Sequence, residues 1–179
     1  IFFSNFGDSG NSLLLKKGDI RDKNVLGNLF GESIKKGKPI KAVLHFAGLK
    51  SVSDSISSPI SYWESNLIGT INLLNVMRKY DCRKLVFSSS ATIYKPKLNN
   101  LINEFSDLSP INPYGNTKLT IETFLNDVYQ SEPDLWSIAL LRYFNPVGAH
   151  SSGLIGEEPL GTPNNLFPII LKVCSGELK

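Results

Sequence analysis

The sequence predicts an α/β fold built around a parallel sheet. Short apolar runs typical of buried strands, at 41–46, 84–87 and 136–143, alternate with longer segments whose apolar residues recur at helical spacing. Parallel strands need crossover connections of helix length, and the segments between these runs are long enough to provide them. The 179 residues suffice for one domain with a substantial core.

The first predicted elements are a short strand at 12–16 and a helix that follows a turn at 18–22. Asp22 is suited to cap this helix, because a carboxylate at that position accepts hydrogen bonds from first-turn amides. The next strand, 41–46, is followed by Ala47 and Gly48. The apolar residues of the helix stand at helical spacing, and they are Val25, Leu26, Leu29, Phe30 and Ile34.

A long helix is predicted from Pro59 to about Tyr80, followed by the strand at 84–87. Ser88–Ser90 are expected in the loop after that strand, and a helix containing Tyr114 precedes the strand at 136–143. The predicted apolar face of the long helix consists of Trp63, Leu67, Ile71, Leu74 and Met77.

Composition excludes several classes of function. A net charge of +3 is too small and too scattered to indicate nucleic acid or an anionic membrane as partner. The two cysteines, Cys82 and Cys174, form neither a disulfide framework nor a metal-ligand spacing. No apolar stretch reaches the ~18–20 residues of a membrane span, and no signal peptide is visible. We therefore expect a cytoplasmic location and no metal.

Tyr114 and Lys118 are the strongest candidates for chemistry. Residues at i and i+4 lie on one face of a helix, so the ammonium is expected to lower the phenol pKa from ~10 by roughly 1–3 units. Tyr114 would then be a base near neutral pH, and the Ser90 hydroxyl would bridge between a substrate oxygen and the phenol. A tyrosine and a lysine at this spacing also occur by chance as a surface pair.

Small, polar or turn residues follow the strands where ligands of parallel sheets bind. They comprise 19–20, 46–50, 88–90 and 144–146. A cofactor lying across the sheet needs such strand ends, although loops in any α/β domain contain similar residues.

Five segments closely resemble the UDP-glucose 4-epimerases of the extended short-chain dehydrogenase/reductase family, in the same order and at nearly the same spacing. They are 45–50, 88–94, 113–119, 140–149 and 163–166. The resemblance implies a Rossmann-like, doubly wound parallel sheet, with NAD as cofactor and UDP-glucose and UDP-galactose as substrates. It also implies a homodimer for the full-length protein.

Individual roles follow from the resemblance position by position. The catalytic residues would be Ser90, Tyr114 and Lys118. Those three would also contact the cofactor, together with Asp19, Ile20, Phe46, Ala47, Gly48, Leu49, Lys50, Asn66 and Phe144. The substrate would contact Ser90, Tyr114, Asn145, Asn165 and Leu166. Asn66 would lie on the nicotinamide side, and the reaction would be a transient oxidation of the sugar at C4.

The chain also departs from the family pattern. The opening strand, glycine-rich turn and helix are missing, and Gly7–Gly10 precedes a strand, so it is expected to be an ordinary loop. We interpret 1–150 as a partial NAD-binding domain and 151–179 as the beginning of a substrate-binding region, truncated at both ends. By itself this chain is expected to be inactive and to bind NAD weakly. Lys95 and Asn116–Thr117 replace the usual residues and are expected to be surface changes.

Two alternatives remain at this point. A nucleotide-sugar dehydratase or another epimerase shares the fold and the tyrosine–lysine pair. A dehydratase, however, has an Asp-Glu pair where this chain has Ala91 and Thr92. A non-catalytic NAD-binding protein would keep the fold and lose the chemistry, which the presence of Ser90, Tyr114 and Lys118 disfavours.

Overall fold

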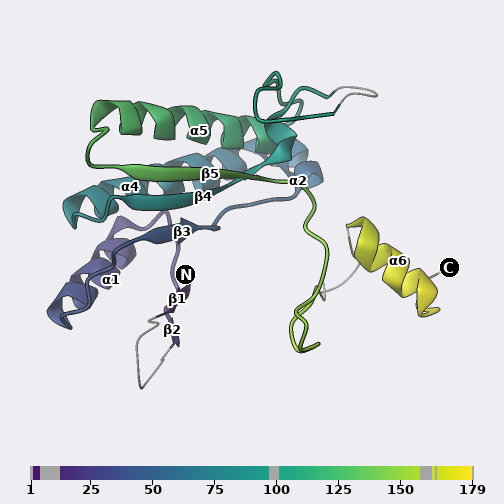
Figure 1. Cartoon of the computed structure of the whole chain (residues 1–179), viewed down its shortest axis with the longest axis horizontal. Coiled ribbons are helices and arrows are strands. Elements are labelled where there is room, and N and C mark those ends of the chain that lie inside the picture. Colours follow the sequence, from purple (N-terminus) through teal and green to yellow (C-terminus); the bar gives the residue numbers. More distant parts are fainter. Residues whose placement is uncertain (1, 5–12, 97–100, 158–162, 164, 179) are drawn as a thin grey trace. The chain divides into compact units, whose positions relative to one another are not determined.

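The structure is a computed structural model that describes residues 2–4, 13–96, 101–157, 163 and 165–178 (Figure 1). It divides into two compact units, Ile1–Arg142 and Tyr143–Lys179. The predicted loop Gly7–Gly10 lies outside the described residues. The predicted boundary at 150, which separates two ligand-binding roles, stays a prediction.

The first unit contains a three-stranded sheet in the order β3 (Val43–His45), β4 (Lys84–Ser90), β5 (Ser137–Tyr143). β3 and β4 are parallel, with Val43 opposite Leu85 and His45 opposite Phe87. Figure 1 shows the three strands side by side, with helices α4 and α5 running along them. The predicted α/β class with a Rossmann-like parallel sheet is confirmed.

The predicted strand at 12–16 exists, but it belongs to a different sheet. β2 (Leu13–Leu15) pairs in antiparallel fashion with β1 (Phe2–Ser4). The expectation that this strand ends beside the others at one edge of the parallel sheet is therefore wrong.

Helix α1 (Lys23–Lys35) begins as predicted. The Asp22 carboxylate accepts hydrogen bonds from the backbone N–H groups of Asn24 and Val25, which satisfies donors that have no partner within the helix. Its buried side chains are Leu26 and Phe30, whereas Ile34, at the end of the predicted apolar face, is 48% exposed.

The predicted helix at 59–80 is a composite that follows a short helix α2 (Val52–Ser57). It comprises α3 (Pro59–Tyr62), a π-helical segment η1 (Trp63–Ile68) and α4 (Gly69–Lys79). Because a π-helical turn is wider than an α-helical turn, it shifts the register of the buried face. Tyr62, Asn66 and Thr70 are buried, whereas Trp63 and Leu67 are only partly buried. Of the predicted apolar face, Leu74 and Met77 belong to the core and Leu67 packs against it, whereas Trp63 and Ile71 are only partly buried.

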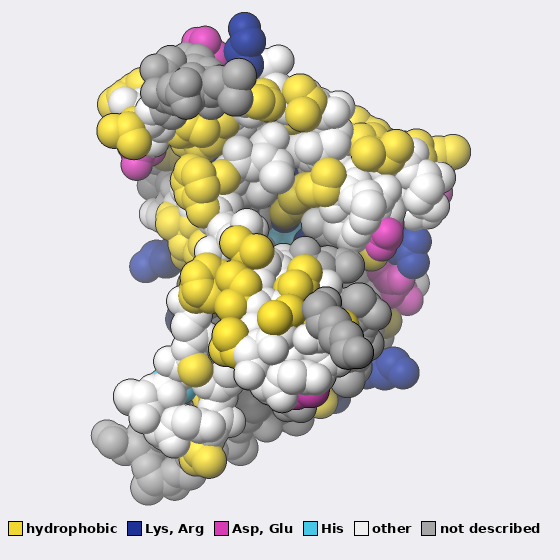
Figure 2. All heavy atoms as spheres, turned by 90° about the vertical axis from the view of Figure 1, so that its right-hand side faces the viewer, with side chains coloured by type: hydrophobic (Ala, Val, Ile, Leu, Met, Phe, Trp, Pro, Cys, Tyr) yellow, Lys and Arg dark blue, Asp and Glu magenta, His cyan; other side chains and the backbone are white. Residues whose placement is uncertain are grey.

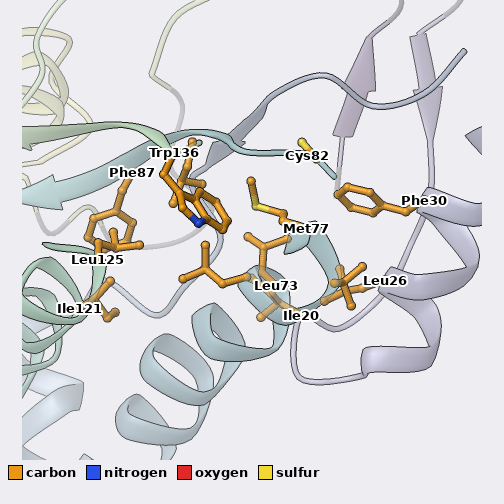
Figure 3. Packing of buried hydrophobic residues seen from close by; sticks show 13 residues of the cluster. Ile20, Leu26, Phe30, Leu73, Met77, Cys82, Phe87, Ile121, Leu125 and Trp136 are labelled. Atoms are coloured by element: carbon orange, nitrogen blue, oxygen red, sulfur yellow. The ribbon is translucent and has the colours of Figure 1, made fainter. Parts of the chain in front are cut away.

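One hydrophobic core lies between the sheet and three helices: α1, α4 and α5 (Pro113–Ser131). Figure 3 shows Leu73 and Met77 of α4 between Leu26 and Phe30 on one side and Ile121, Leu125 and Phe87 on the other. Burying such apolar side chains stabilises the fold by roughly 1.5–3 kcal/mol each. The core therefore fixes α5, which carries Tyr114 and Lys118, against β4.

The opposite face of the sheet is apolar and exposed among the described residues. Leu44 of β3 is 65% exposed and Leu141 of β5 is 40% exposed. Since side chains alternate between the faces of a strand, these residues point away from the core side of the sheet.

In its described residues, the second unit contains irregular segments and helix α6 (Leu166–Cys174). Figure 2 shows hydrophobic side chains gathered over this helix, and Leu166, Ile170 and Leu171 are each more than one-third exposed. Within the described part of the chain, no helix is both long enough and apolar enough to cross a membrane.

Candidate active site

Ser90 is the last residue of β4. The predicted strand ended at 87 with Ser90 in the following loop, so the observed strand is longer than predicted. Its Oγ accepts hydrogen bonds from the Thr92 N–H (3.2 Å) and from the Thr92 hydroxyl (3.0 Å). Both bonds use Ser90 as acceptor, so its own proton remains available for donation. Thr92 lies in a 3₁₀ turn, η2 (Ala91–Ile93), directly after the strand.

The start of α5 packs tightly against this turn. The Asn112 side chain caps the helix by accepting from the Gly115 N–H at 2.8 Å. A Cβ on Gly115 would stand 2.7 Å from the Thr92 carbonyl oxygen and 2.8 Å from the Pro110 Cβ. Only a glycine allows the helix to approach so closely, and this approach brings Tyr114 to the end of β4.

Burial raises the pKa of Tyr114, and the Ser90 hydroxyl acts in the opposite direction. The expectation of a lowered pKa is therefore wrong for the protein by itself, because loss of water around the phenol outweighs the hydrogen bond from Ser90. The Tyr114 ring also packs edge-on against Tyr62, with ring centroids 6.4 Å apart. Tyr62 is itself held by its hydroxyl, which donates to the Ser51 carbonyl at 2.6 Å.

Lys118 lies one helical turn after Tyr114, and its ammonium is 5.8 Å from the centre of the tyrosine ring. It donates a hydrogen bond to the Ser88 carbonyl at 2.7 Å and stands 4.7 Å from the centre of the Phe87 ring. Burial lowers the pKa of Lys118 to about 8. The lysine is thus mainly protonated at neutral pH, and it is tied to the same strand end as Ser90.

The loop at 46–50 follows β3 and is exposed throughout. Asn66 of η1 holds it in place. The Asn66 Oδ1 accepts from the Leu49 N–H at 2.8 Å, and its Nδ2 donates to the Leu49 carbonyl at 3.1 Å and to the Thr117 Oγ1 at 3.1 Å. Both amide hydrogens of Asn66 are therefore used within the protein, which leaves only one lone pair of Oδ1 for the predicted contact to a cofactor.

A second buried polar group lies behind this loop. His45 at the end of β3 shares a 2.8 Å hydrogen bond with the Thr70 hydroxyl, which in turn donates to the Asn66 carbonyl at 2.6 Å. Because the threonine proton is used in that bond, the His45 Nε2 is the donor. Burial, together with the charge of Lys118, lowers the pKa of His45 to about 3, so this histidine is neutral.

Asp19 and Ile20 lie in the turn before α1. The Asp19 carboxylate pairs with the Arg21 guanidinium at 2.7 Å, which lowers the pKa of Asp19 to about 2. Ile20 is buried in the core. Asn72 of α4 donates to the Arg21 carbonyl at 2.8 Å, so this turn is attached to the helical layer.

The remaining predicted residues lie in the second unit. Phe144 and Asn145 are exposed in the segment after β5. Asn165 precedes α6 and donates to the Glu157 carboxylate at 2.9 Å, and Leu166 is the first residue of α6. The roles predicted for these residues stay predictions.

Several contacts of the site were not predicted. Thr92, Tyr62 and Thr117 each touch a predicted residue or its backbone. Thr117 was expected to be a surface change, but it is fully buried. Its position three residues after Tyr114 was a usable signal, because such residues share a helix face; the contacts of Thr92 and Tyr62 depend on tertiary packing. Among the described residues, no group of three or more His, Cys, Asp or Glu side chains could hold a metal ion.

Comparison with curated proteins finds close relatives. UDP-glucose 4-epimerase 2 of Arabidopsis thaliana is 49% identical over 170 residues, which is 95% of this chain and 47% of the relative. The bifunctional UDP-glucose 4-epimerase and UDP-xylose 4-epimerase 1 of Pisum sativum is 51% identical over 162 residues, 90% of this chain and 44% of the relative. The chain spans less than half the length of these relatives.

Solved structures show the same fold. The UDP-glucose 4-epimerase of Bifidobacterium longum, crystallised with NAD+ and UDP, is 47% identical with a TM-score of 0.81, covering 92% of this chain and 48% of that one. The enzyme of Stenotrophomonas maltophila, with bound NAD and formylated UDP-arabinopyranose, is 46% identical with a TM-score of 0.81, covering 90% of this chain and 46% of that one. Residues 3–175 match the family described as NAD dependent epimerase/dehydratase. With the fold, the strand-end site and this match over nearly the whole chain in agreement, the chain belongs to the NAD dependent epimerase/dehydratase family.

Proposed function

We propose that the full-length protein carrying this chain interconverts UDP-glucose and UDP-galactose with NAD as cofactor. One observation carries the proposal: Ser90, Tyr114 and Lys118 meet at the end of β4. Of the two residues from α5, Tyr114 interacts with the Ser90 hydroxyl and Lys118 donates to the Ser88 carbonyl. Relatives about half identical to this chain are UDP-glucose 4-epimerases, and the proposal assigns their reaction to this site.

The described residues fit NAD in their chemistry. Ala47 and Gly48 leave the exposed backbone after β3 without bulky side chains, where a dinucleotide can approach closely. Gly48 has a φ of +153°, and a Cβ there would stand 2.8 Å from the Asn66 Oδ1, so glycine is required for this shape. Lys118 would bind the nicotinamide ribose, and the loop at 46–50 would lie along the cofactor. NAD, when bound, supplies a reversible two-electron oxidation at C4 of the sugar.

Tyr114 would act as the base that takes the proton of the sugar 4-hydroxyl. Since burial raises the pKa of Tyr114, formation of the phenolate requires positive charge nearby. Lys118 supplies it, because a lysine with a pKa of about 8 keeps its proton at pH 7. Ser90 would donate its free hydroxyl proton to the phenolate or to the sugar oxygen, since Thr92 occupies its acceptor side.

The alternative reaction within the family is dehydration of the sugar. It needs an acid and a base beside the serine, where this chain has Ala91 and Thr92. The Thr92 hydroxyl donates to Ser90 and has no titratable proton near neutral pH, so it cannot replace a carboxyl group. We therefore favour epimerisation over dehydration, and catalysis over mere NAD binding. A homodimer and a cytoplasmic location stay predictions.

The test is a product analysis of the purified full-length protein incubated with UDP-galactose. Formation of UDP-glucose, with NAD retained on the protein, supports the proposal. A 4-keto-6-deoxy sugar nucleotide would instead show a dehydratase, and no turnover by NAD-loaded protein would show a binding protein. UDP-xylose is a useful second substrate, because the pea relative is named for both activities.

A further inference from the structure

Asn66 occupies an unusual position for a polar side chain. It lies in the π-helical segment η1, it is only 2% exposed, and it faces two other elements at once. π-Helical turns are rare and are frequently found at functional sites. Here the turn places an amide, rather than the apolar residue that ordinary helical spacing would provide, between the loop at 46–50 and α5.

On the loop side, the Asn66 side-chain amide forms two hydrogen bonds with the backbone of Leu49, as a residue of a neighbouring β-strand would. Its Oδ1 accepts from the Leu49 N–H at 2.8 Å and its Nδ2 donates to the Leu49 carbonyl at 3.1 Å. The side chain thus satisfies both backbone groups of a residue in an irregular loop. The Gly48 backbone lies so close to the Oδ1 that no other residue fits there without movement.

On the helix side, the contact runs through Thr117. The second hydrogen of the Asn66 Nδ2 goes to the Thr117 Oγ1 at 3.1 Å, and the Thr117 hydroxyl donates to the Tyr114 carbonyl at 2.7 Å. Thr117 has no exposed surface. Every proton in this series has one acceptor, so the bonds that connect Leu49 with the Tyr114 turn have one arrangement.

We propose that Asn66 and Thr117 are positioning residues that hold the loop at 46–50 and the Tyr114 turn of α5 in a fixed relation. The proposal rests on the proposed function, in which that loop lies along the cofactor and Tyr114 reacts with the sugar. We call this connection the clamp. Asn66 is hydrogen-bonded to both the loop and α5, whereas Thr117 is hydrogen-bonded to Asn66 and to the Tyr114 turn. The two residues therefore predict different effects on NAD binding and on turnover.

Thr117→Val removes the hydroxyl at constant size and leaves the pairing of Asn66 with Leu49 in place. We expect kcat to fall about tenfold, because small displacements of a reacting group are costly, with the Kd for NAD changed by less than about twofold. Thr117→Ser keeps the hydroxyl and should restore kcat to within about twofold of the wild type. Asn66→Leu should lower kcat and also weaken NAD binding about tenfold, because the loop loses its anchor.

Hydrogen exchange of the Leu49 amide is the readout that does not depend on activity. Its N–H donates to the Asn66 Oδ1, so exchange should accelerate in Asn66→Leu and stay slow in Thr117→Val. Thr70→Val is the matched control: the lost hydroxyl is equally buried and bonds to His45 and to the backbone carbonyl of Asn66, but it does not touch the Asn66 side chain. It should lower stability without changing the exchange of Leu49.

These measurements separate the two proposals. If the wild-type protein does not convert UDP-galactose, the proposed function fails, while the Leu49 amide still decides whether the clamp exists. Unchanged exchange in Asn66→Leu would overturn the clamp, as would a Thr117→Val enzyme with wild-type kcat. Thr117→Val, which changes no volume, keeps the test decisive if Asn66→Leu does not fold.

Discussion

At the scale of single residues, burial favours the uncharged forms of both Tyr114 and Lys118. It raises the pKa of the phenol and lowers the pKa of the ammonium to about 8. Burial therefore disfavours the charged form of each residue. The Ser90 hydroxyl offsets part of this effect for Tyr114, and the Ser88 carbonyl does so for Lys118. Burial of charged groups is costly, and it is tolerated at sites where the charge has a function.

Tyr114→Phe is expected to lower the kcat of the full-length protein by roughly 10²–10⁴, because it removes the base and keeps the ring. NAD binding should persist, since Lys118 and the loop at 46–50 are unchanged. Steady-state kinetics and NAD titration measure the two effects separately. Tyr129→Phe, at an exposed position of the same helix, should retain activity, and a fully active Tyr114→Phe enzyme would exclude Tyr114 as the base.

Lys118→Met is expected to raise the free energy of unfolding at pH 7 while abolishing turnover. In the folded protein Lys118 has a pKa of about 8, against 10.5 for an unperturbed lysine. Between these values the unfolded chain binds more protons than the folded one, so wild-type stability rises with pH through this window. Below pH 8 the full cost of burying the ammonium is present, and methionine avoids it.

Urea unfolding of both proteins between pH 7 and pH 10 checks this prediction. The stability advantage of Lys118→Met should shrink as pH rises. Lys35→Met, at an exposed position in α1, is the control and should show no such trend. A constant difference across the range would mean that Lys118 is not desolvated in the folded protein.

At the scale of elements, the site depends on how closely α5 approaches the turn after β4. The core formed by Ile121, Leu125 and Phe87 holds the helix on the sheet. Gly115 lets its first turn touch Thr92 and Pro110. The position of Tyr114 is therefore decided by a residue that has no functional group of its own.

Gly115→Ala is expected to destabilise the protein by roughly 1–3 kcal/mol, because the new methyl group meets a backbone oxygen and a proline ring. Turnover should fall as well, since the Tyr114 turn must move. Gly27→Ala is the matched control: this glycine also lies in a helix, but its Cβ would have only the Tyr80 hydroxyl at 4.0 Å. It should stabilise the protein by about 0.5–1 kcal/mol; thermal unfolding of both variants tests the contrast.

At the scale of the whole first unit, the Glu122–Arg142 pair connects parts that are distant in sequence. The Arg142 guanidinium donates to the Glu122 carboxylate of α5 at 2.7 Å, to the Tyr94 hydroxyl at 3.0 Å and to the Glu104 carbonyl at 3.1 Å. Hydrogen bonds with Glu122 raise the pKa of Arg142. The pair thereby joins the end of β5 to α5 and to the segment after β4.

Arg142→Met is expected to destabilise the protein by about 3 kcal/mol, because it leaves the Glu122 carboxylate buried without its partner. Adding Glu122→Leu should recover much of this loss, since the uncompensated charge is then removed. Arg78→Met is the control, because Arg78 pairs with Glu132 at an exposed position, and it should change stability by less than about 1 kcal/mol. Denaturant unfolding measures all four proteins, and a double variant no more stable than Arg142→Met would contradict the prediction.

Local patterns in the sequence determined the α/β class, the cap at Asp22 and the pairing of Tyr114 with Lys118 on one face of a helix. Each of these depends on residues a few positions apart, so spacing and side-chain type suffice to predict them. The family resemblance added candidate residues whose roles no local pattern defines.

Only the tertiary structure decided the rest. It separated β2 from the parallel sheet, turned Asn66 inward through a π-helical segment, buried Thr117, and raised rather than lowered the pKa of Tyr114. The reason is common to all four cases. Desolvation, and contacts between segments tens of residues apart, arise only when those segments pack together, and a linear sequence displays neither distance nor exposure to water.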